Sequence, residues 1–240
     1  MTDIPKEIAY EILPDDYTQY DLSFKIIVIG DSGVGKSCLT NKATKNIFND
    51  NYNATVGFEF FTFNVRISDK IIKLQIWDTC GQELYRSLIT NFYRNSSLAL
   101  IVFAVNNRES FDDIDMWLRE LRTHSNPDVK IFLIGNKIDL EDERKITKGE
   151  AEEYAKNNNL NKYVETSAKT GINAQDTFID VAYLLYEDYL KYKDEDKEDI
   201  SYDGESMRSR KETAKSIKSL DTPVAKVIIK NKEKSGCCGK

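Results

Sequence analysis

The chain has 240 residues, of which 40% are apolar and 31% charged, and its formal net charge at pH 7 is −6. This length fits one domain with extensions or two small domains, and the apolar content is enough for a core. The negative charge argues against a nucleic-acid-binding body. The longest apolar run, residues 98–105, has the length of a strand rather than of a membrane span. The N-terminus lacks a signal peptide's apolar stretch, so we expect a reducing cytosol and no disulfides among the four cysteines.

Residues 1–21 are polar and acidic without a clear period, which predicts a loose extension that is free to dock on the domain behind it. An apolar run at residues 24–29 predicts the first strand. The sequence GDSGVGKS follows at residues 30–37, and a helix-compatible run continues to about Ile47. A strand, a glycine-rich loop of the form G-x-x-x-x-G-K-S and a helix are the context of a phosphate-binding P-loop.

The P-loop residues predict binding of a nucleotide's phosphates. The glycines let backbone N–H groups face inward at a helix N-terminus, which forms a nest for anions. Lys36 would reach the β- and γ-phosphates, and the Ser37 hydroxyl would bind a magnesium ion. This loop alone does not say which base is bound.

A second group of polar residues follows a predicted hairpin. Apolar and polar residues alternate over residues 61–67 and 72–77, which predicts two antiparallel strands. The sequence DTCGQE comes next, and Asp78 at its start is placed to hold magnesium as a Walker-B aspartate does. Gly81 is placed to offer its backbone N–H to a γ-phosphate, and Gln82 to orient an attacking water.

Strands and helices alternate over the rest of the chain. We expect buried strands at residues 98–105 and 129–134 and a short strand at residues 163–166. One helix is expected to start at the Ser110-x-x-Asp113 signature and a second at the Thr147-x-x-Glu150 capping box. A last long helix is expected to stop near Tyr192. This order predicts an α/β fold with a parallel, doubly wound sheet and one antiparallel edge from the hairpin. Ligands bind such sheets at the carboxyl ends of the strands, where all these motifs lie.

The sequence NKID at residues 136–139 indicates the base. The Asp139 carboxylate can accept two hydrogen bonds from guanine, whereas adenine lacks that pair of donors. An unpaired buried carboxylate costs roughly 1–3 kcal/mol or more, which gives tenfold discrimination or better. The stem of Lys137 would pack along the ring, and residues 167–169 (Ser167, Ala168, Lys169) would supply backbone groups for the base's O6.

Four motifs in this order resemble those of the Ras superfamily of small GTPases, and within it the Rab family: GDSGVGKS, WDTCGQE, NKID and ETSAK. Rab character comes from Ser32, from TVGFEF at residues 55–60, from Trp77 and from residues 84–95. The resemblance implies a P-loop G domain over residues 22–192, with a six-stranded, mostly parallel sheet, one antiparallel edge strand and helices on both faces. Residues 1–21 would be an N-terminal extension and residues 193–240 a disordered hypervariable tail.

The resemblance also implies roles for individual residues. Gln82 would be catalytic, Phe48 would pack against guanine, and Thr55 would bind magnesium and sense the γ-phosphate. The magnesium ligands would be Ser37, Thr55 and Asp78, and the surface read by effectors would be Phe60, Trp77 and Phe92. The residues expected to bind GTP are Asp31, Ser32, Gly33, Val34, Gly35, Lys36, Ser37, Cys38, Phe48, Thr55, Gly81, Asn136, Lys137, Asp139, Ser167, Ala168 and Lys169.

The C-terminal tail indicates a membrane anchor. Residues 193–205 hold two lysines and seven acids, residues 206–240 hold ten basic residues and three acids, and no helical or strand period persists. Cys237 and Cys238 lack the aliphatic residues of a CaaX box and resemble the Rab double-geranylgeranyl signal. Two lipid chains give stable anchoring where one is marginal. The implied location is the cytoplasmic face of an intracellular membrane, in exchange with the cytosol.

The resulting hypothesis is a GTP/GDP switch of vesicle traffic with a slow intrinsic rate. Its implied partners are effectors, an exchange factor, a GTPase-activating protein that supplies an arginine finger, the prenylation machinery and a GDP-dissociation inhibitor. A P-loop kinase or ATPase is a rival, but Asp139 argues against an adenine site. A nucleotide-locked binding module with negligible hydrolysis is another, because Cys80 stands where Rabs usually have alanine. Phe58 and Asn95 are further departures from the family pattern.

Overall fold

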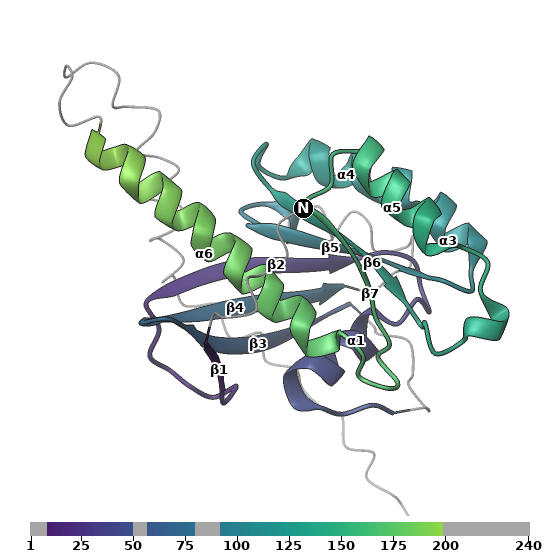
Figure 1. The fold of residues 1–240 in the computed structure, drawn as a ribbon, viewed down its shortest axis with the longest axis horizontal. Coiled ribbons are helices and arrows are strands. Elements are labelled where there is room, and N and C mark those ends of the chain that lie inside the picture. The colour runs from purple at the N-terminus through teal and green to yellow at the C-terminus, as the bar shows by residue number, and fades with distance from the viewer. Residues whose placement is uncertain (1–8, 50–56, 80–91, 199–240) are drawn as a thin grey trace, which may run out of the picture. The chain divides into compact units, whose positions relative to one another are not determined.

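A computed structural model describes residues 9–49, 57–79 and 92–198 of the chain. Its centre is a seven-stranded sheet in the order β1-β3-β4-β2-β5-β6-β7 (Figure 1). The strands are β1 (Tyr10–Leu13), β2 (Leu22–Ile29), β3 (Phe58–Ile67), β4 (Lys70–Thr79), β5 (Leu98–Ala104), β6 (Lys130–Asn136) and β7 (Lys162–Glu165). The predicted doubly wound α/β class is confirmed, but the predicted count of six strands is wrong by one, because β1 was not foreseen.

Five of the strands, β4, β2, β5, β6 and β7, run parallel. Their register aligns Val28 with Asp78 and Ala104 with Asn136, so the carboxyl ends of neighbouring strands meet at one edge of the sheet. Strand β3 is antiparallel to β4, as the hairpin predicted, and it is also antiparallel to β1. The antiparallel edge therefore has two pairings rather than one.

Strand β1 lies within the segment predicted to be a loose extension. It pairs with the outer edge of β3, from Tyr10 opposite Ile67 to Leu13 opposite Asn64. The Asn64 side chain is 1% exposed and donates from Nδ2 to the Pro14 carbonyl at 2.7 Å. Beyond this turn, Asp21 accepts a hydrogen bond from the Ile71 backbone N–H at the start of β4. The segment is thus fastened to both strands of the hairpin.

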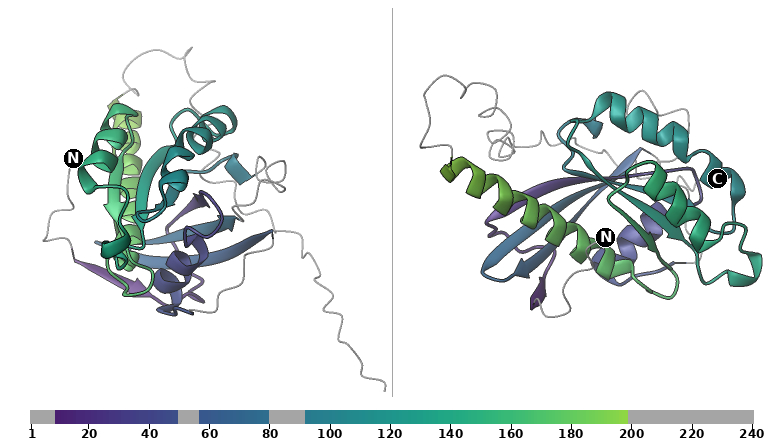
Figure 2. Two further views of the ribbon diagram at one scale, coloured as in Figure 1. Left: turned by 90° about the vertical axis from the view of Figure 1, so that its right-hand side faces the viewer. Right: turned by 45° about the horizontal axis from the view of Figure 1, so that its top comes forward.

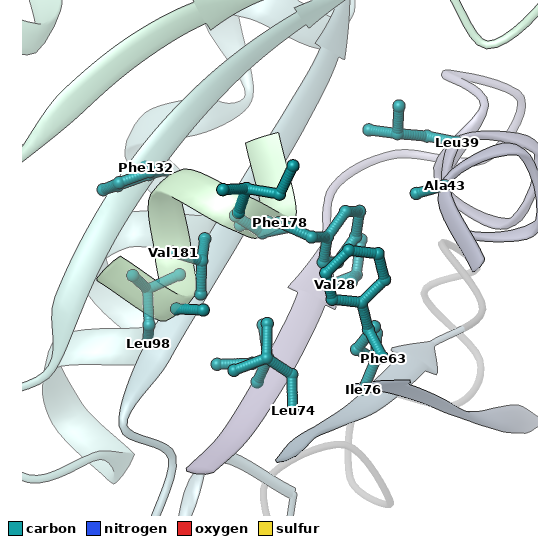
Figure 3. Packing of buried hydrophobic residues seen from close by; sticks show 14 of the residues in the cluster. Val28, Leu39, Ala43, Phe63, Leu74, Ile76, Leu98, Phe132, Phe178 and Val181 are labelled. Carbon is teal, nitrogen blue, oxygen red and sulfur yellow. The ribbon is translucent and has the colours of Figure 1, made fainter. Parts of the chain in front are cut away.

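Helices lie on both faces of the sheet (Figure 2). On one face, α1 (Lys36–Lys45) and α6 (Ala174–Glu198) cover a cluster in which Val28 and Phe63 of the sheet meet Phe178 of α6 (Figure 3). On the other face, α3 (Arg108–Asp112), α4 (Ile114–His124) and α5 (Lys148–Asn157) cover a second cluster. The short turn η2 (Glu141–Glu143) follows β6. The near-continuous apolar run of β5 is buried because both faces are covered.

The helix boundaries correct two predictions. The Ser110 signature does not begin a helix: Asn107 caps α3 by accepting from the Glu109 N–H at 3.1 Å, and Ser110 Oγ instead accepts from the Ala104 N–H. The capping box of α5 is confirmed in its first half, since Thr147 Oγ1 accepts from the Glu150 N–H at 3.2 Å. Helix α6 ends at Glu198 rather than near Tyr192. Within the described ranges, no helix is both long and apolar enough to cross a membrane.

Candidate functional site

Four segments that are distant in the sequence meet beyond the carboxyl ends of the parallel strands. They are the loop between β2 and α1, the end of β4, the residues after β6 and the loop after β7. Parallel strands in register bring their carboxyl ends to the same edge, which explains the meeting.

The loop between β2 and α1 needs glycine at two positions. Gly30 has φ +134°, and a Cβ there would lie 2.1 Å from the Val102 carbonyl oxygen of β5. Gly35 has φ +95°, and a Cβ there would lie 2.5 Å from Asn136 Nδ2. Both the left-handed backbone and the close approach of a neighbouring strand therefore exclude a side chain. The loop is held tightly against β5 and the end of β6.

Lys36 is placed to meet an anion over this loop. Its side chain is 6% exposed, and Nζ donates to the carbonyls of Gly30 at 2.8 Å and Asp31 at 2.7 Å. Helix α1 begins at Lys36 behind Gly35, with no side-chain cap and no acidic residue in its first turn. The first-turn N–H groups, which no side chain caps, and the positive end of the helix dipole then favour a phosphate at this point.

The end of β4 carries a buried carboxylate beside the first turn of α1. Asp78 is 0% exposed, and its Oδ2 accepts a hydrogen bond from the Ser37 hydroxyl. Asp78 Oδ1 is buried and has no hydrogen-bond partner in the part of the chain that the structure describes. Burial raises the pKa of Asp78 to about 7, against the hydrogen bond from Ser37 and the charge of Lys36, which lower it.

These oxygens fit a magnesium ion. Magnesium prefers hard oxygen donors and is commonly held by one or two protein oxygens together with substrate phosphates. The orphaned oxygen of Asp78 and the hydroxyl of Ser37 are donors of this kind, next to the predicted phosphate site. A bound cation would also favour the charged form of Asp78, which burial alone disfavours.

Asn136 joins the loops of the site. Its Nδ2 donates to the Val34 carbonyl of the P-loop at 2.9 Å, and its Oδ1 accepts from Thr166 Oγ1 and from the Ala168 N–H, each at 3.2 Å. Asn136 is 0% exposed. A side chain predicted to bind nucleotide is thus a brace between the P-loop and the loop after β7, which the NKID pattern by itself did not reveal.

Asp139 lies against that same loop. Its Oδ1 accepts from Ser167 Oγ at 2.5 Å, and Ser167 Oγ in turn accepts from the Thr170 N–H at 3.0 Å. Lys137 has φ +67°, and its Cε lies 3.9 Å from where a Cβ of Gly35 would be, so its stem passes close to the P-loop. The residues predicted to recognise guanine therefore meet around one point next to the phosphate loop.

The loop after β7 has a support that the sequence did not reveal. Arg144, between η2 and α5, donates to Glu165 Oε1 at 2.8 Å and also pairs with Glu141. Glu165 is the last residue of β7 and stands directly before Thr166 and Ser167. Nothing in the local sequence marks this pair, because its two residues come from different elements.

An aromatic surface lies near the ends of β3 and β4. The predicted residues Phe60, Trp77 and Phe92 are adjacent, with ring centroids 5.2 Å apart for Phe60–Trp77 and 5.2 Å apart for Trp77–Phe92. Phe58 adds a fourth ring, 4.7 Å from Phe92 and 5.6 Å from Trp77. Phe58 and Phe60 are each 49% exposed, so two of the four rings are partly exposed to solvent.

The other predicted residues have varied surroundings. In the P-loop, Ser32 and Gly33 are exposed and Val34 is buried. Cys38 and Phe48 are half-buried against the cluster under α1 and α6, and burial raises the pKa of the Cys38 thiol. In the loop after β7, Ala168 is buried and Lys169 exposed. The remaining predicted positions lie outside the described residues: Thr55, Cys80, Gly81, Gln82, Cys237 and Cys238.

A doubly wound sheet with a phosphate loop after its first parallel strand and a buried carboxylate at the end of the next defines a P-loop nucleotide-binding protein. Comparison with known proteins gives the family. The chain belongs to the Ras family, whose sequence model matches residues 25–187. It is also 40% identical over 186 residues to "Ras-related protein Rab-10" of Diplobatis ommata, which covers 77% of this chain and 92% of that protein. The predicted resemblance to Rab-type GTPases of the Ras superfamily is confirmed.

Proposed function

We propose that this protein is a molecular switch that binds GTP with magnesium, hydrolyses it to GDP, and regulates vesicle-mediated transport. One observation carries the proposal furthest: the buried Asn136 side chain links the phosphate loop to the loop that meets Asp139. The residues that we propose to bind the phosphates and the base are therefore joined in a single site.

The residues of the site suggest how GTP is held. Lys36 and the first-turn N–H groups of α1 bind the phosphate oxygens, and Asp139 accepts hydrogen bonds from the guanine edge. Ser37 and Asp78 would hold magnesium, together with Thr55 from outside the described residues. A bound ion would supply positive charge against the negative charge of the phosphates. Gln82 orients the water that attacks the γ-phosphorus, and GDP and inorganic phosphate are released.

The difference between GTP and GDP would be read through two segments. The γ-phosphate holds Thr55 and Gly81, which orders the segments before β3 and after β4, and hydrolysis releases them. These strands carry Phe60 and Trp77, so an ordered state completes the aromatic surface for an effector. We expect a slow intrinsic rate, raised by an activating protein that supplies an arginine. In Ras, a relative, an activating protein raises the rate of hydrolysis about 10⁵-fold.

The location and partners follow from the tail and the family. Geranylgeranyl groups on Cys237 and Cys238 anchor the protein to the cytoplasmic face of an intracellular membrane, with exchange through the cytosol. The basic residues of the tail add attraction to anionic lipids. An exchange factor, the prenylation machinery and a GDP-dissociation inhibitor complete the cycle.

Single-turnover hydrolysis of GTP by the full chain tests the proposal. We expect slow cleavage in the native protein and a further loss of rate in Gln82→Leu, with nucleotide binding intact. A nucleotide-locked binding module is the second candidate, because Cys80 stands beside Gly81 and Gln82. If the protein is such a module, the native protein should not cleave GTP, and Cys80→Ala should restore cleavage. Equal rates in the native protein and Gln82→Leu would remove Gln82 from the reaction.

A further inference from the structure

A side chain of α4 is bonded directly to the phosphate loop. The indole Nε1 of Trp117 donates to Asp31 Oδ1 at 2.7 Å, across 86 residues of sequence. Asp31 is the second residue of the P-loop, and its backbone carbonyl accepts from Lys36 Nζ at 2.7 Å. Asp31 therefore accepts two hydrogen bonds. Its backbone carbonyl accepts one from Lys36, and its carboxylate accepts one from Trp117, which lies on the other face of the sheet.

Trp117 is a rigid support. It is 1% exposed and is among the largest fully buried side chains of the described residues. It belongs to the cluster between the sheet and the helices α3, α4 and α5, with Phe111, Ile114 and Leu121. Close packing keeps the indole ring in one position. A hydrogen bond from its N–H to a carboxylate is also stronger than one between neutral groups. The bond thus fixes Asp31 relative to α4.

The environment of Asp31 disfavours its charged form, which the Trp117 N–H stabilises. Burial raises the pKa of the Asp31 carboxyl, and the carboxylate of Asp113 at the start of α4 raises it further, whereas the Trp117 N–H lowers it. A half-buried carboxylate near a like charge is unfavourable unless a donor compensates it. Without the Trp117 N–H, the Asp31 carboxylate would lose the hydrogen bond that stabilises its charged form.

We propose that Trp117 is a positioning residue of the nucleotide site: by holding Asp31 it holds the carbonyl that orients Lys36, so an indole N–H in α4 slows nucleotide release. The proposal rests on the proposed function in one respect only, namely that the P-loop binds guanine nucleotide. Trp117 touches neither nucleotide nor magnesium in this account, and its effect passes through Asp31.

The test is the dissociation rate of a fluorescent GDP analogue from the full chain, chased with excess GDP. Trp117→Phe keeps an aromatic ring and removes the N–H, and Asp31→Leu removes the acceptor. We expect either change to speed release about tenfold, since a hydrogen bond to a charged group is worth about that factor or more. Asp31→Asn keeps an oxygen acceptor for the indole, so it should release GDP more slowly than Asp31→Leu.

Two measurements separate positioning from mere packing. The double variant Trp117→Phe with Asp31→Leu should release GDP no faster than either single variant, because both remove the same bond. Tyr154→Phe is the matched control, since it removes an aromatic donor to Asp115 of α4 at 2.5 Å without touching the P-loop. Its release rate should equal that of the native protein.

The outcomes that overturn the proposal are distinct from failure of the proposed function. If the native protein binds the GDP analogue and Trp117→Phe releases it at the native rate, the positioning role is wrong while guanine binding stands. Two results would show that only packing was lost. Either the rate of GDP release in the double variant rises by the product of the two single effects, or Tyr154→Phe speeds release as much as Trp117→Phe does. If Trp117→Phe does not fold, the contrast between Asp31→Leu and Asp31→Asn decides in its place. No binding of the analogue by the native protein would refute the proposed function itself.

Discussion

Replacing Asn136 by alanine should both destabilise the fold and weaken nucleotide binding. At a fully buried position, the side chain makes three hydrogen bonds of 3.2 Å or less, to the carbonyl of Val34, the hydroxyl of Thr166 and the N–H of Ala168. A longer bond of 3.4 Å reaches the Gly35 carbonyl. Each bond contributes about 1 kcal/mol, and buried groups left without partners add to the loss, so we expect a fall in unfolding free energy of roughly 3 kcal/mol. Because the two loops would no longer be linked, the Kd for GDP should rise about tenfold or more.

Denaturant unfolding and titration with a fluorescent GDP analogue measure the two effects separately. The control is Asn158→Ala at the end of α5, where Nδ2 donates a single bond to the Tyr154 carbonyl at 3.1 Å. This change should cost about 1 kcal/mol or less and leave the Kd unchanged. If Asn136→Ala lowers the unfolding free energy no more than the control does, and its Kd matches that of the native protein, then the brace has no energetic role and the reasoning is refuted.

Three further predictions concern the base, the anchor and the N-terminal strand. Asp139→Asn should shift the binding preference from GTP toward xanthosine triphosphate in a competition assay, since the amide offers a donor where guanine needs an acceptor. An unchanged preference would remove Asp139 from the base site. Cys237→Ser with Cys238→Ser should leave the protein in the cytosol after cell fractionation, and persistent membrane association would refute lipid anchoring at these residues. Deleting residues 1–13 removes the pairing of β1 with β3 and should lower the unfolding midpoint by about 2–8 °C, because a few hydrogen bonds are lost. Deleting residues 1–8 keeps β1 and should leave the midpoint unchanged. Equal midpoints for the two deletions would show that β1 adds no stability.

Much of the site could be predicted because its motifs are local. GDSGVGKS, DTCGQE and NKID each follow an apolar strand directly, and the carboxyl ends of parallel strands meet. The alternation in the hairpin and the buried run of β5 likewise predicted their elements from side-chain period alone. Site residues that lie in one short segment at the end of a strand can therefore be predicted from the sequence.

Strand β1 shows where that reasoning stops. Four residues without alternating burial carry no period of their own, so they form a strand only because β3 offers an open edge and the buried Asn64 amide holds the turn that follows. The start of α3 is similar, since this helix begins at Arg108 behind the Asn107 cap and not at the Ser110 signature.

The sequence by itself determined the α/β class, the phosphate loop, the predicted base and magnesium residues and the family resemblance, because these depend on residue types at fixed local spacing. Only the tertiary structure decided that Asn136 braces two loops, that Phe58 joins the aromatic surface and that Trp117 holds Asp31. In the sequence, Trp117 is one of four apolar residues at helical spacing, with Ile114, Leu118 and Leu121. Its indole N–H gained a partner 86 residues away only when the sheet placed α4 beside the P-loop. Bonds between distant segments depend on packing geometry, which no local pattern encodes.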